Sequence, residues 1–433
     1  MTNWVRHVIW WQVYPLGFVG AFPAADPPGP EQHRLNRLTE WLDYAVGLGV
    51  SGIALGPIFS SRTHGYDTTD YYRIDPRLGD ESDFEHFVSH AHRRGLKVLL
   101  DGVFNHVGTD FGQHRAAQEG QSEALNWFIG APGHFRTFEG HQDLITLNHR
   151  NPAVADHVAA VMSHWLARGA DGWRLDAAYA VPESFWARVL PRVRELHPNA
   201  WFVAEVIHGD YPTFVTATGV DSVTQYELWK AIWSSLNDGN FFELDWALQR
   251  HNDFQKTFAP LTFLGNHDVT RIGSKLHQPE HRGHALVVLL TIGGVPSVYA
   301  GDERGLTGVK EDRAGGDDAI RPEFPDPATI SDADTDIGRL YRFLIGLRRR
   351  NPWLHQARTS TLQLENLVYV YRSSNGSDAL IVALNLQDQV QPLPVKALTG
   401  SSAEIIAGSG APTAEVVSHC DIPGLGWLIL RPC

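Results

Sequence analysis

The feature that most constrains the fold is a regular alternation of apolar, strand-like runs with helical patterns from residue 7 to about residue 350. The predicted strands are His7–Leu16, Val50–Phe59, Lys97–Phe104, Gly172–Ala177, Trp201–Ile207, Asp221–Glu227, Leu261–Asp268 and Ser297–Glu303. The predicted helices lie near 33–47, 82–94, 152–168, 182–197, 211–218, 229–250, 280–292 and 335–350. Strand–helix units in strict alternation favour an α/β fold of the (β/α)8 TIM-barrel type over an open sheet.

Helix start signals support this assignment at two places. Ser82 and Glu85 have the spacing of a capping box, which predicts a helix that begins at residue 82. Asn151 precedes Pro152, a cap followed by a first-turn proline, and predicts a second helix that begins there.

Two segments depart from the barrel pattern. Residues 107–147 separate the third strand from its helix and are rich in Gly, His and Gln, and a connection of this length is usually functional. After residue 355 short alternating runs with turn residues between them predict a small all-β domain. We therefore expect a barrel formed by 1–106 and 148–354, a domain B at 107–147, and a C-terminal β-sandwich at 355–433.

The composition of the chain limits the kinds of partner that it is expected to bind. Asp and Glu outnumber Lys and Arg by 49 to 36, for a net charge of −13, which argues against a nucleic-acid partner. The longest apolar stretch, Ala285–Ala300, is too short for a membrane span and contains Gly293, Gly294 and Pro296. The first residues lack the pattern of a secretory signal, so we expect a cytoplasmic protein with a neutral ligand.

Three carboxylates stand at the ends of three predicted strands. Asp176 ends the fourth, Glu205 the fifth and Asp268 the seventh, each after an otherwise apolar run. Reactive groups of a TIM barrel gather at the carboxyl ends of its strands. Since burying an unpaired carboxylate is costly, three such positions favour a catalytic site over three unrelated ion pairs.

The neighbours of these carboxylates suggest their chemistry. Arg174 and Asp176 are two residues apart on a strand and face the same way, so the guanidinium would keep Asp176 ionised, as a nucleophile requires. Glu205, facing Asp176 and Asp268, would be pushed towards the protonated form that a proton donor needs. Two carboxyls in opposite protonation states are the arrangement for glycoside cleavage through a covalent intermediate.

The motifs around these residues resemble the α-amylase family, glycoside hydrolase family thirteen, over essentially the whole chain. DGVFNH at 101–106, GWRLD at 172–176, AEV at 204–206 and GNHD at 265–268 match four family motifs in order. The stretch THGYDTTDYYRIDPRLG at 63–79 matches a further one. Together these matches are highly specific.

The resemblance implies a role for each matched position. Asp176 would form the glycosyl-enzyme, Glu205 would act as general acid and base, and Asp268 would hold the hydroxyls of the sugar and distort its ring. The implied substrate-binding residues are Tyr66, Asp67, His106, Arg174, His267, Arg321, Tyr179 and His208. Asp101 would support the site by pairing with Arg174. Asn105 often helps to bind calcium in this family, so calcium is a candidate ligand although no cofactor is required.

Among family branches, the chain looks most like the neopullulanase and cyclomaltodextrinase group, although the extra N-terminal β domain of that group is not evident. It departs from typical α-amylases in having Tyr179 and Ala180 where Lys and His are common, which predicts a more apolar leaving-group side. We therefore expect a retaining hydrolase of α-1,4 glucosidic bonds, with α-1,6 bonds as a further candidate, in short maltooligosaccharides or cyclodextrins. The sequence does not predict the oligomeric state.

Two alternatives remain. A 4-α-glucanotransferase or a trehalose synthase-like isomerase would use the same site up to the covalent intermediate and differ only in the acceptor. A sugar-binding protein without activity is the other, although such proteins usually lose the acids that this chain retains.

Overall fold

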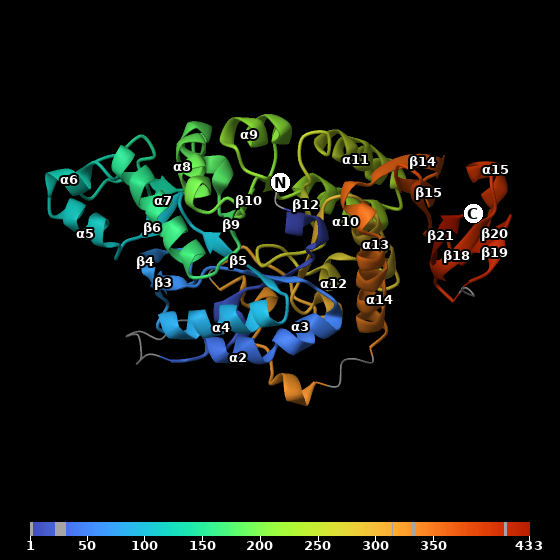
Figure 1. Ribbon diagram of the computed structural model, residues 1–433, viewed down its shortest axis with the longest axis horizontal. Helices are drawn as coiled ribbons and strands as arrows, with labels where there is room; N and C mark the ends of the chain where they lie inside the picture. The colour runs from blue at the N-terminus through green and yellow to red at the C-terminus, as the bar shows by residue number, and fades with distance from the viewer. Residues whose placement is uncertain (1–2, 22–31, 314, 331–334, 411–413) are drawn as a thin grey trace. The chain divides into compact units, whose positions relative to one another are not determined.

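A computed structural model describes residues 3–21, 32–313, 315–330, 335–410 and 414–433 (Figure 1). The chain divides into two compact units, each of which is described by itself. The first contains residues 1–224 and 321–330, and the second contains residues 225–320 and 331–433.

Six parallel strands run through the first unit in the order β11-β10-β9-β5-β2-β1. Their bounds are β1 Trp10–Val13, β2 Gly52–Leu55, β5 Lys97–Gly102, β9 Gly172–Leu175, β10 Trp201–Ala204 and β11 Ser222–Val223. All residues of β9 and β10 are buried, as expected for parallel strands covered on both faces. The register pairs Asp101 of β5 with Arg174 of β9, so two predicted site residues are neighbours across the sheet.

The predicted helices follow these strands (Figure 1), and a short helix that was not predicted, α1, follows β1. They are α1 Pro15–Phe18, α2 Leu35–Glu40, α3 Leu42–Leu48, α4 Glu81–Arg93, α7 Pro152–Ala167, α8 Glu183–Leu196 and α9 Tyr211–Thr218. At the start of α7 the Asn151 side chain accepts a hydrogen bond from the Ala153 N–H, and Pro152 occupies the first turn. This start agrees with the prediction. The helix expected at 33–47 is divided in two at Trp41.

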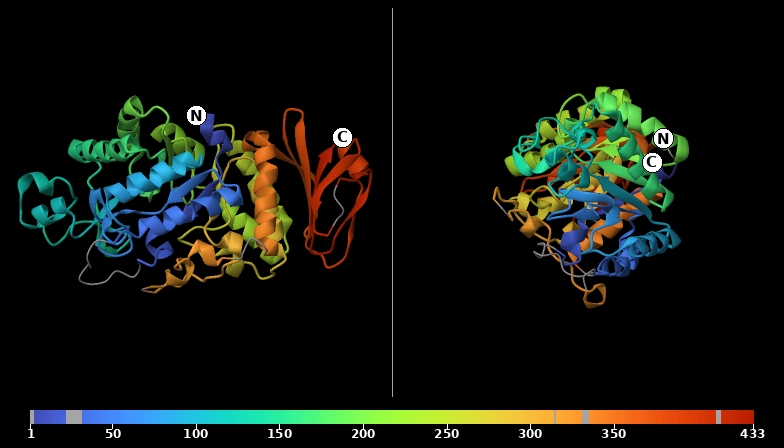
Figure 2. Two further views of the ribbon diagram at one scale, coloured as in Figure 1. Left: turned by 60° about the horizontal axis from the view of Figure 1, so that its bottom comes forward. Right: turned by 90° about the vertical axis from the view of Figure 1, so that its left-hand side faces the viewer.

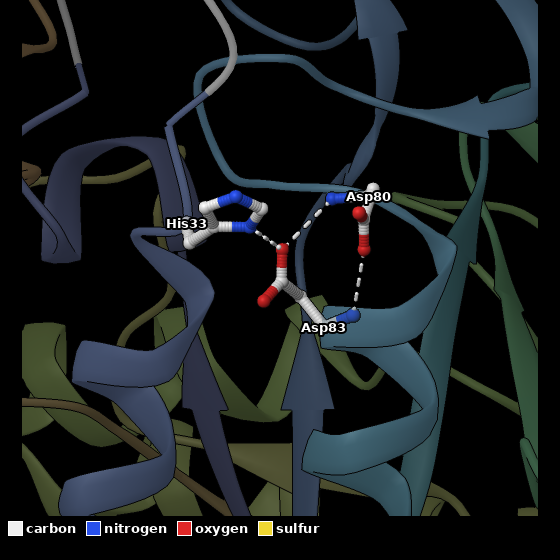
Figure 3. Close-up of side chains that lie close together, drawn as sticks. All are labelled: His33, Asp80 and Asp83. Atoms are coloured by element: carbon white, nitrogen blue, oxygen red, sulfur yellow. Dashed lines mark hydrogen bonds and ion pairs between the residues drawn. The ribbon is translucent and has the colours of Figure 1, made fainter.

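The cap of α4 differs from the prediction. Asp80, not Ser82, caps the helix by accepting from the Asp83 N–H over 2.9 Å, and Asp83 Oδ2 accepts in return from the Asp80 N–H over 3.0 Å. His33 Nδ1 also lies 2.6 Å from Asp83 Oδ2 (Figure 3). The predicted capping box at Ser82 and Glu85 was therefore wrong by two residues, because both pairs satisfy the same spacing rule and a contact from outside the helix favours the earlier pair.

Two small antiparallel sheets are inserted between the barrel elements of the first unit. The hairpin of β3 Phe59–Ser61 and β4 Thr68–Ile74 follows β2. The second sheet has the order β6-β8-β7, with β6 His106–Gly108, β7 Thr137–Phe138 and β8 His141–Thr146. It is accompanied by α5 Gly112–Gln118 and α6 Ser122–Leu125, so most of the long 107–147 segment has regular structure.

The second unit contains the remaining parallel strands, β12 Leu261–Phe263 and β13 Val295–Tyr299, which pair with each other. Its helices are α10 Tyr226–Asp238, α11 Phe241–Phe254, α12 Ile272–Lys275, α13 His281–Thr291 and α14 Asp336–Arg350. The single helix predicted at 229–250 is divided because Gly239 adopts a positive φ of 60° and Asn240 caps α11 by accepting from the Phe242 N–H.

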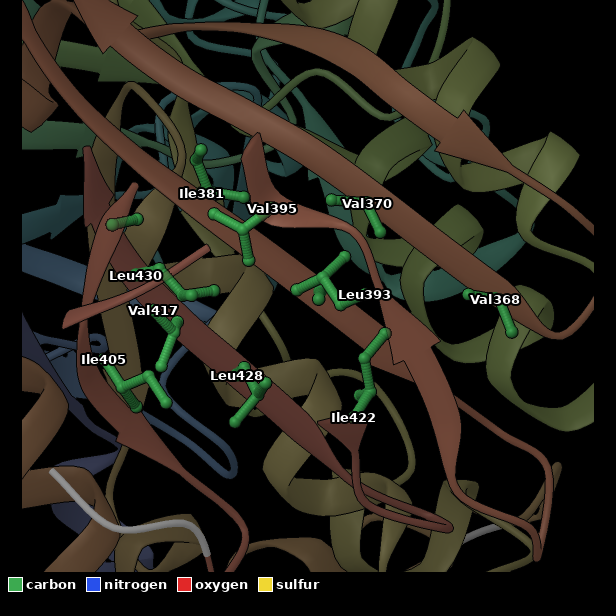
Figure 4. Packing of buried hydrophobic residues seen from close by; sticks show 12 residues of the cluster. Val368, Val370, Ile381, Leu393, Val395, Ile405, Val417, Ile422, Leu428 and Leu430 are labelled. Carbon is green, nitrogen blue, oxygen red and sulfur yellow. The ribbon is translucent and has the colours of Figure 1, made fainter. Parts of the chain in front are cut away.

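The C-terminal part of the second unit is antiparallel, as predicted. A six-stranded sheet has the order β14-β15-β16-β21-β18-β19, and a two-stranded sheet pairs β17 with β20 (Figure 2). The bounds are β14 Arg358–Leu364, β15 Val368–Asn375, β16 Asp378–Asn385, β17 Gln391–Leu393, α15 Val395–Thr399, β18 Ala403–Gly408, β19 Val416–Val417, β20 Cys420–Ile422 and β21 Trp427–Pro432. Alternate residues such as Val368 and Val370 share one buried cluster with Leu428 and Leu430 (Figure 4).

Polar contacts join helix α13 to these C-terminal strands. His284 Nε2 lies 3.1 Å from the carbonyl oxygen of Asn385 and 2.9 Å from that of Gly426. Ser373 Oγ donates to the Thr291 carbonyl oxygen over 2.6 Å, and the Thr291 and Tyr371 hydroxyls lie 2.7 Å apart. All of these groups are buried and lie within the second unit.

Along the chain, the strands of the two units alternate with helices in the predicted order, which confirms the (β/α)8 barrel with an antiparallel C-terminal sheet. The compact units divide the chain at residues 224 and 320, inside the barrel, and so do not follow the predicted domain boundaries. Those boundaries stay a prediction. Among the described residues, no helix has the length and apolarity that a membrane span requires.

Candidate active site

Arg174 lies at the centre of the carboxylates of the first unit. Its Nη1 lies 2.7 Å from Asp101 Oδ2 and 3.2 Å from Asp176 Oδ1, and its Nη2 lies 2.7 Å from Glu205 Oε1. All four side chains are buried. Because β5, β9 and β10 are adjacent, the ends of three strands deliver three carboxylates to one guanidinium.

The charges around Arg174 keep it ionised. Burial acts to lower the pKa of Arg174, but the carboxylates of Asp101 and Glu205 raise it well above its ordinary value. A buried cation with these partners can offset part of the repulsion among the carboxylates. From the sequence, Glu205 was expected to face the carboxylates of Asp176 and Asp268. Its contact with the Arg174 guanidinium was not predicted.

A strained turn next to Asp176 supplies a second donor to Glu205. Ala177 adopts a φ of 44°, and its backbone N–H donates to Glu205 Oε2 over 2.9 Å. A left-handed conformation costs a non-glycine residue about 1–2 kcal/mol. Such strain is typical of functional sites, where neighbouring contacts hold the backbone in place.

Tyr66 and His106 lie around the same group of residues. The Tyr66 hydroxyl donates to Asp101 Oδ2 over 3.2 Å. The His106 ring stacks on Phe138 with a centroid distance of 4.7 Å and an interplanar angle of 13°. Burial lowers the pKa of His106 to about 3, so its imidazole is neutral near pH 7 and can donate or accept one hydrogen bond at each nitrogen.

Asp67 and Arg321, two of the predicted substrate-binding residues, are both buried in the first unit. Asp67 Oδ2 accepts from the Thr63 hydroxyl over 2.8 Å and lines a hollow of about 370 Å³ together with His64, Thr109 and His141. The Arg321 guanidinium lies 4.6 Å from the centre of the Tyr14 ring. These contacts fix both side chains in place.

Tyr179 and His208 occupy different environments. The Tyr179 hydroxyl donates to Glu139 Oε1 over 2.9 Å, and the Tyr179 N–H donates to the Glu205 carbonyl oxygen over 3.3 Å. His208 lies in an exposed turn after β10. Glu139 was not predicted as a site residue. The only local signal for the turn that carries it is the following residue, Gly140, because glycine favours tight turns.

His267 and Asp268 follow β12 in the second unit. His267 is buried, and its Nε2 lies 3.1 Å from Asp268 Oδ2. Asn266 shapes this turn because its Oδ1 accepts from the Asp268 N–H over 2.9 Å and its Nδ2 donates to the Tyr226 hydroxyl over 2.8 Å. Asp268 is partly exposed.

Asn105, the predicted calcium ligand, lies in the segment between β5 and β6. Asn105 Oδ1 is buried without a hydrogen-bond partner among the described residues, which is the one feature that fits a cation. Among all the residues that the structure describes, the only group of three or more His, Cys or acidic residues with metal-binding geometry is His33, Asp80 and Asp83. Those residues form the α4 cap (Figure 3), and calcium at Asn105 stays a prediction.

Known proteins resemble this chain in sequence and in fold. The sequence family described as "Alpha amylase, catalytic domain" matches residues 12–339. The cyclomaltodextrinase of Geobacillus thermopakistaniensis is 27% identical over 99% of this chain and 77% of its own length. Neopullulanase 2 of Thermoactinomyces vulgaris is 30% identical over 80% of this chain and 63% of its own length. The structure of an acarbose-soaked debranching enzyme of Nostoc punctiforme superposes with a TM-score of 0.83, at 26% identity over 100% of this chain and 99% of the other.

The barrel fold and the family match define this chain as a glycosidase. It belongs to the α-amylase family, and cyclomaltodextrinases and neopullulanases are among its relatives.

Proposed function

We propose that this glycosidase hydrolyses α-1,4 glucosidic bonds in short maltooligosaccharides and cyclodextrins, with retention of configuration, and that α-1,6 bonds are a second linkage it cleaves. The observation that carries the proposal is the contact of one guanidinium, Arg174, with both Asp176 and Glu205 at 3.2 and 2.7 Å. Two carboxyls held together at strand ends are what a double displacement requires. The names of the cyclomaltodextrinase and neopullulanase relatives support the substrate class.

In the first step, an Asp176 carboxylate oxygen attacks the anomeric carbon while the bond from that carbon to the leaving oxygen breaks. The leaving oxygen takes the proton of the Glu205 carboxyl, and the sugar remains bound to Asp176 as an ester. In the second step, ionised Glu205 removes a proton from water, whose oxygen attacks the anomeric carbon and releases Asp176. Glu205 ends the cycle protonated, and the two inversions give net retention.

Other residues would assist without forming bonds to the sugar. Arg174 would stabilise the negative charge of the Asp176 carboxylate before it attacks the sugar. The Ala177 N–H would orient Glu205. Asp268 would bind hydroxyls of the reacting sugar, with His267 beside it. Neutral His106 and Asp67 would hydrogen-bond hydroxyls of the same sugar.

Azide distinguishes the two carboxylates. With an activated aryl α-maltoside, Glu205→Ala plus azide is expected to give the α-glycosyl azide, because azide replaces water in the second displacement. Asp176→Ala plus azide is expected to give the β-glycosyl azide, because azide replaces the nucleophile. NMR of the products reports the configuration, and the opposite assignment would reverse the roles of the two residues.

Product chromatography tests the substrate class and the transferase alternative. The wild type and Glu205→Gln would be incubated with maltotriose, a cyclodextrin, panose and pullulan. Glucose and maltose that are absent with Glu205→Gln would support the hydrolase. Longer or isomerised products from concentrated maltose would support a transferase or isomerase, a reading favoured by the aromatic Tyr179 close to Glu205.

A further inference from the structure

The hairpin formed by β7 and β8 has an unusual turn at Glu139. Phe138 pairs with His141, so the turn has two central residues, Glu139 and Gly140, with φ values of 48° and 83°. Two positive φ angles define a type I′ turn, in which Asn-Gly is the preferred pair. Glutamate has no conformational reason to occupy the first central position, so the side chain itself is the feature to explain.

The hairpin contacts the candidate active site at two points. Phe138 stacks on His106, and Glu139 Oε1 accepts from the Tyr179 hydroxyl over 2.9 Å. Tyr179 lies three residues after Asp176, and its N–H bonds to the Glu205 carbonyl oxygen. The turn is therefore tied to the segment that follows β5 and to the segment that follows Asp176.

We infer that Glu139 is a specificity residue for the sugar on the leaving-group side of the scissile bond. One carboxylate oxygen holds the Tyr179 hydroxyl, and the other accepts a hydroxyl of that sugar. The inference rests on the proposed function, because it assumes that Asp176 and Glu205 act on a glycosidic bond. It also changes the prediction of a simply apolar leaving-group side, since the inserted hairpin adds an acidic group there.

The chemistry of the pair suits a neutral sugar. Glu139 is exposed, and Oε2 has no hydrogen-bond partner among the residues that the structure describes. A carboxylate accepts strong hydrogen bonds from hydroxyl groups, and a tyrosine ring offers a flat apolar face to a pyranose ring. Burial and the Glu139 carboxylate raise the pKa of Tyr179, so its hydroxyl stays protonated and continues to donate to Glu139.

The turn itself provides matched variants. Glu139→Asn introduces the preferred residue of a type I′ turn but a side chain too short to reach Tyr179, and Glu139→Gly removes the side chain and the strain together. Both variants should melt at the same temperature as the wild type or higher. Glu139→Gln keeps an oxygen that accepts from Tyr179 and is the conservative variant.

The experiment compares maltotriose, which places a sugar on the leaving-group side, with 4-nitrophenyl α-maltoside, whose leaving group has no sugar hydroxyls. For Glu139→Asn and Glu139→Gly, kcat/KM for maltotriose relative to the aryl maltoside should fall about tenfold, mainly through KM. Glu139→Gln should recover most of this ratio. Combining Glu139→Asn with Tyr179→Phe should add little to either single loss, because the two groups act together.

Two results would overturn the inference alone. An equal loss of kcat/KM on both substrates would show that Glu139 only supports the fold, and unchanged kcat/KM values on both substrates would show that it has no role in recognition. If the wild type turned over neither substrate, or if Glu205→Gln retained full activity on maltotriose, the proposed function would fail and the inference with it.

Discussion

The backbone N–H of Ala177 donates a hydrogen bond to Glu205 Oε2 over 2.9 Å, from a residue with a φ of 44°. The residue that follows the predicted nucleophile therefore positions the predicted acid and base. This arrangement couples the backbone of one strand end to the side chain of the next, since β9 and β10 are adjacent.

The strain at Ala177 leads to a first prediction. Ala177→Val places a β-branched residue in the left-handed region and should lower the free energy of unfolding by about 1–3 kcal/mol, with a fall in kcat as Glu205 loses its donor. Ala177→Gly should change the unfolding free energy by less than about 1 kcal/mol. Urea unfolding and steady-state kinetics measure both effects. Full stability and activity in Ala177→Val would show that the turn carries no strain.

Removing Arg174, the cation shared by three carboxylates, should strongly reduce both stability and activity. Arg174→Met leaves Asp101, Asp176 and Glu205 buried without their counter-ion, and we expect a loss of about 3–5 kcal/mol of unfolding free energy. We also expect kcat to fall by at least about 100-fold. Arg192→Met is the matched control, because the Arg192–Asp156 pair is exposed and should contribute less than about 1 kcal/mol. Equal effects of the two substitutions on urea unfolding would contradict the role assigned to Arg174.

Buried histidines predict a loss of stability in acid. Burial lowers the pKa of His284 and of His251 to about 4, whereas an unfolded histidine titrates near about 6.5. Between these values the unfolded chain binds a proton that the folded chain does not. Stability is therefore fully present above about pH 6.5 and falls as the pH drops towards 4.

The size of this effect can be measured at His284. Each fully coupled histidine contributes a slope of up to about 1.4 kcal/mol per pH unit in this window. His284→Gln should be less stable than the wild type at pH 7 but should show a shallower slope between pH 6 and 4.5 in urea unfolding. If the unfolding free energy of the variant fell with pH as steeply as that of the wild type, His284 would already be protonated in the folded chain, and the prediction would be wrong.

The C-terminal cluster gives a prediction about packing. Leu428 is completely buried in the cluster of Figure 4, so Leu428→Ala should remove about 2–5 kcal/mol of unfolding free energy. Val416 is 61% exposed, and Val416→Ala should change stability by no more than about 1 kcal/mol. Thermal unfolding of both variants makes the comparison, and a similar melting temperature for the two would contradict the cluster as the core of this region.

The parts of the fold that followed from sequence were those with strong local signals. Strand β10 is entirely apolar, and strand β9 is apolar except for Arg174, up to the positions of Asp176 and Glu205. These short apolar runs therefore located both strand ends. Asn151 and Pro152 located the start of α7 because the cap and the first-turn proline act within a few residues of each other.

The parts that did not follow depend on distant contacts or on disfavoured conformations. The α4 cap moved to Asp80 and Asp83, where His33 bonds to Asp83, and no local rule ranks that pair above Ser82 and Glu85. Glu139 could not be found from turn propensities because glutamate is a poor choice at a positive φ, and its partner Tyr179 is forty residues away.

The hydrogen bonds of His284 have a consequence for protein engineering. They join helix α13 to the turns beside Asn385 and Gly426, with Thr291 and Ser373 adding a second bridge. Replacing the C-terminal strands by strands without these acceptors and donors would leave buried polar groups of the helix unpaired, and each such group costs about 1–3 kcal/mol. The C-terminal sheet is consequently not an interchangeable module, and chimaeras of this enzyme should exchange it together with α13.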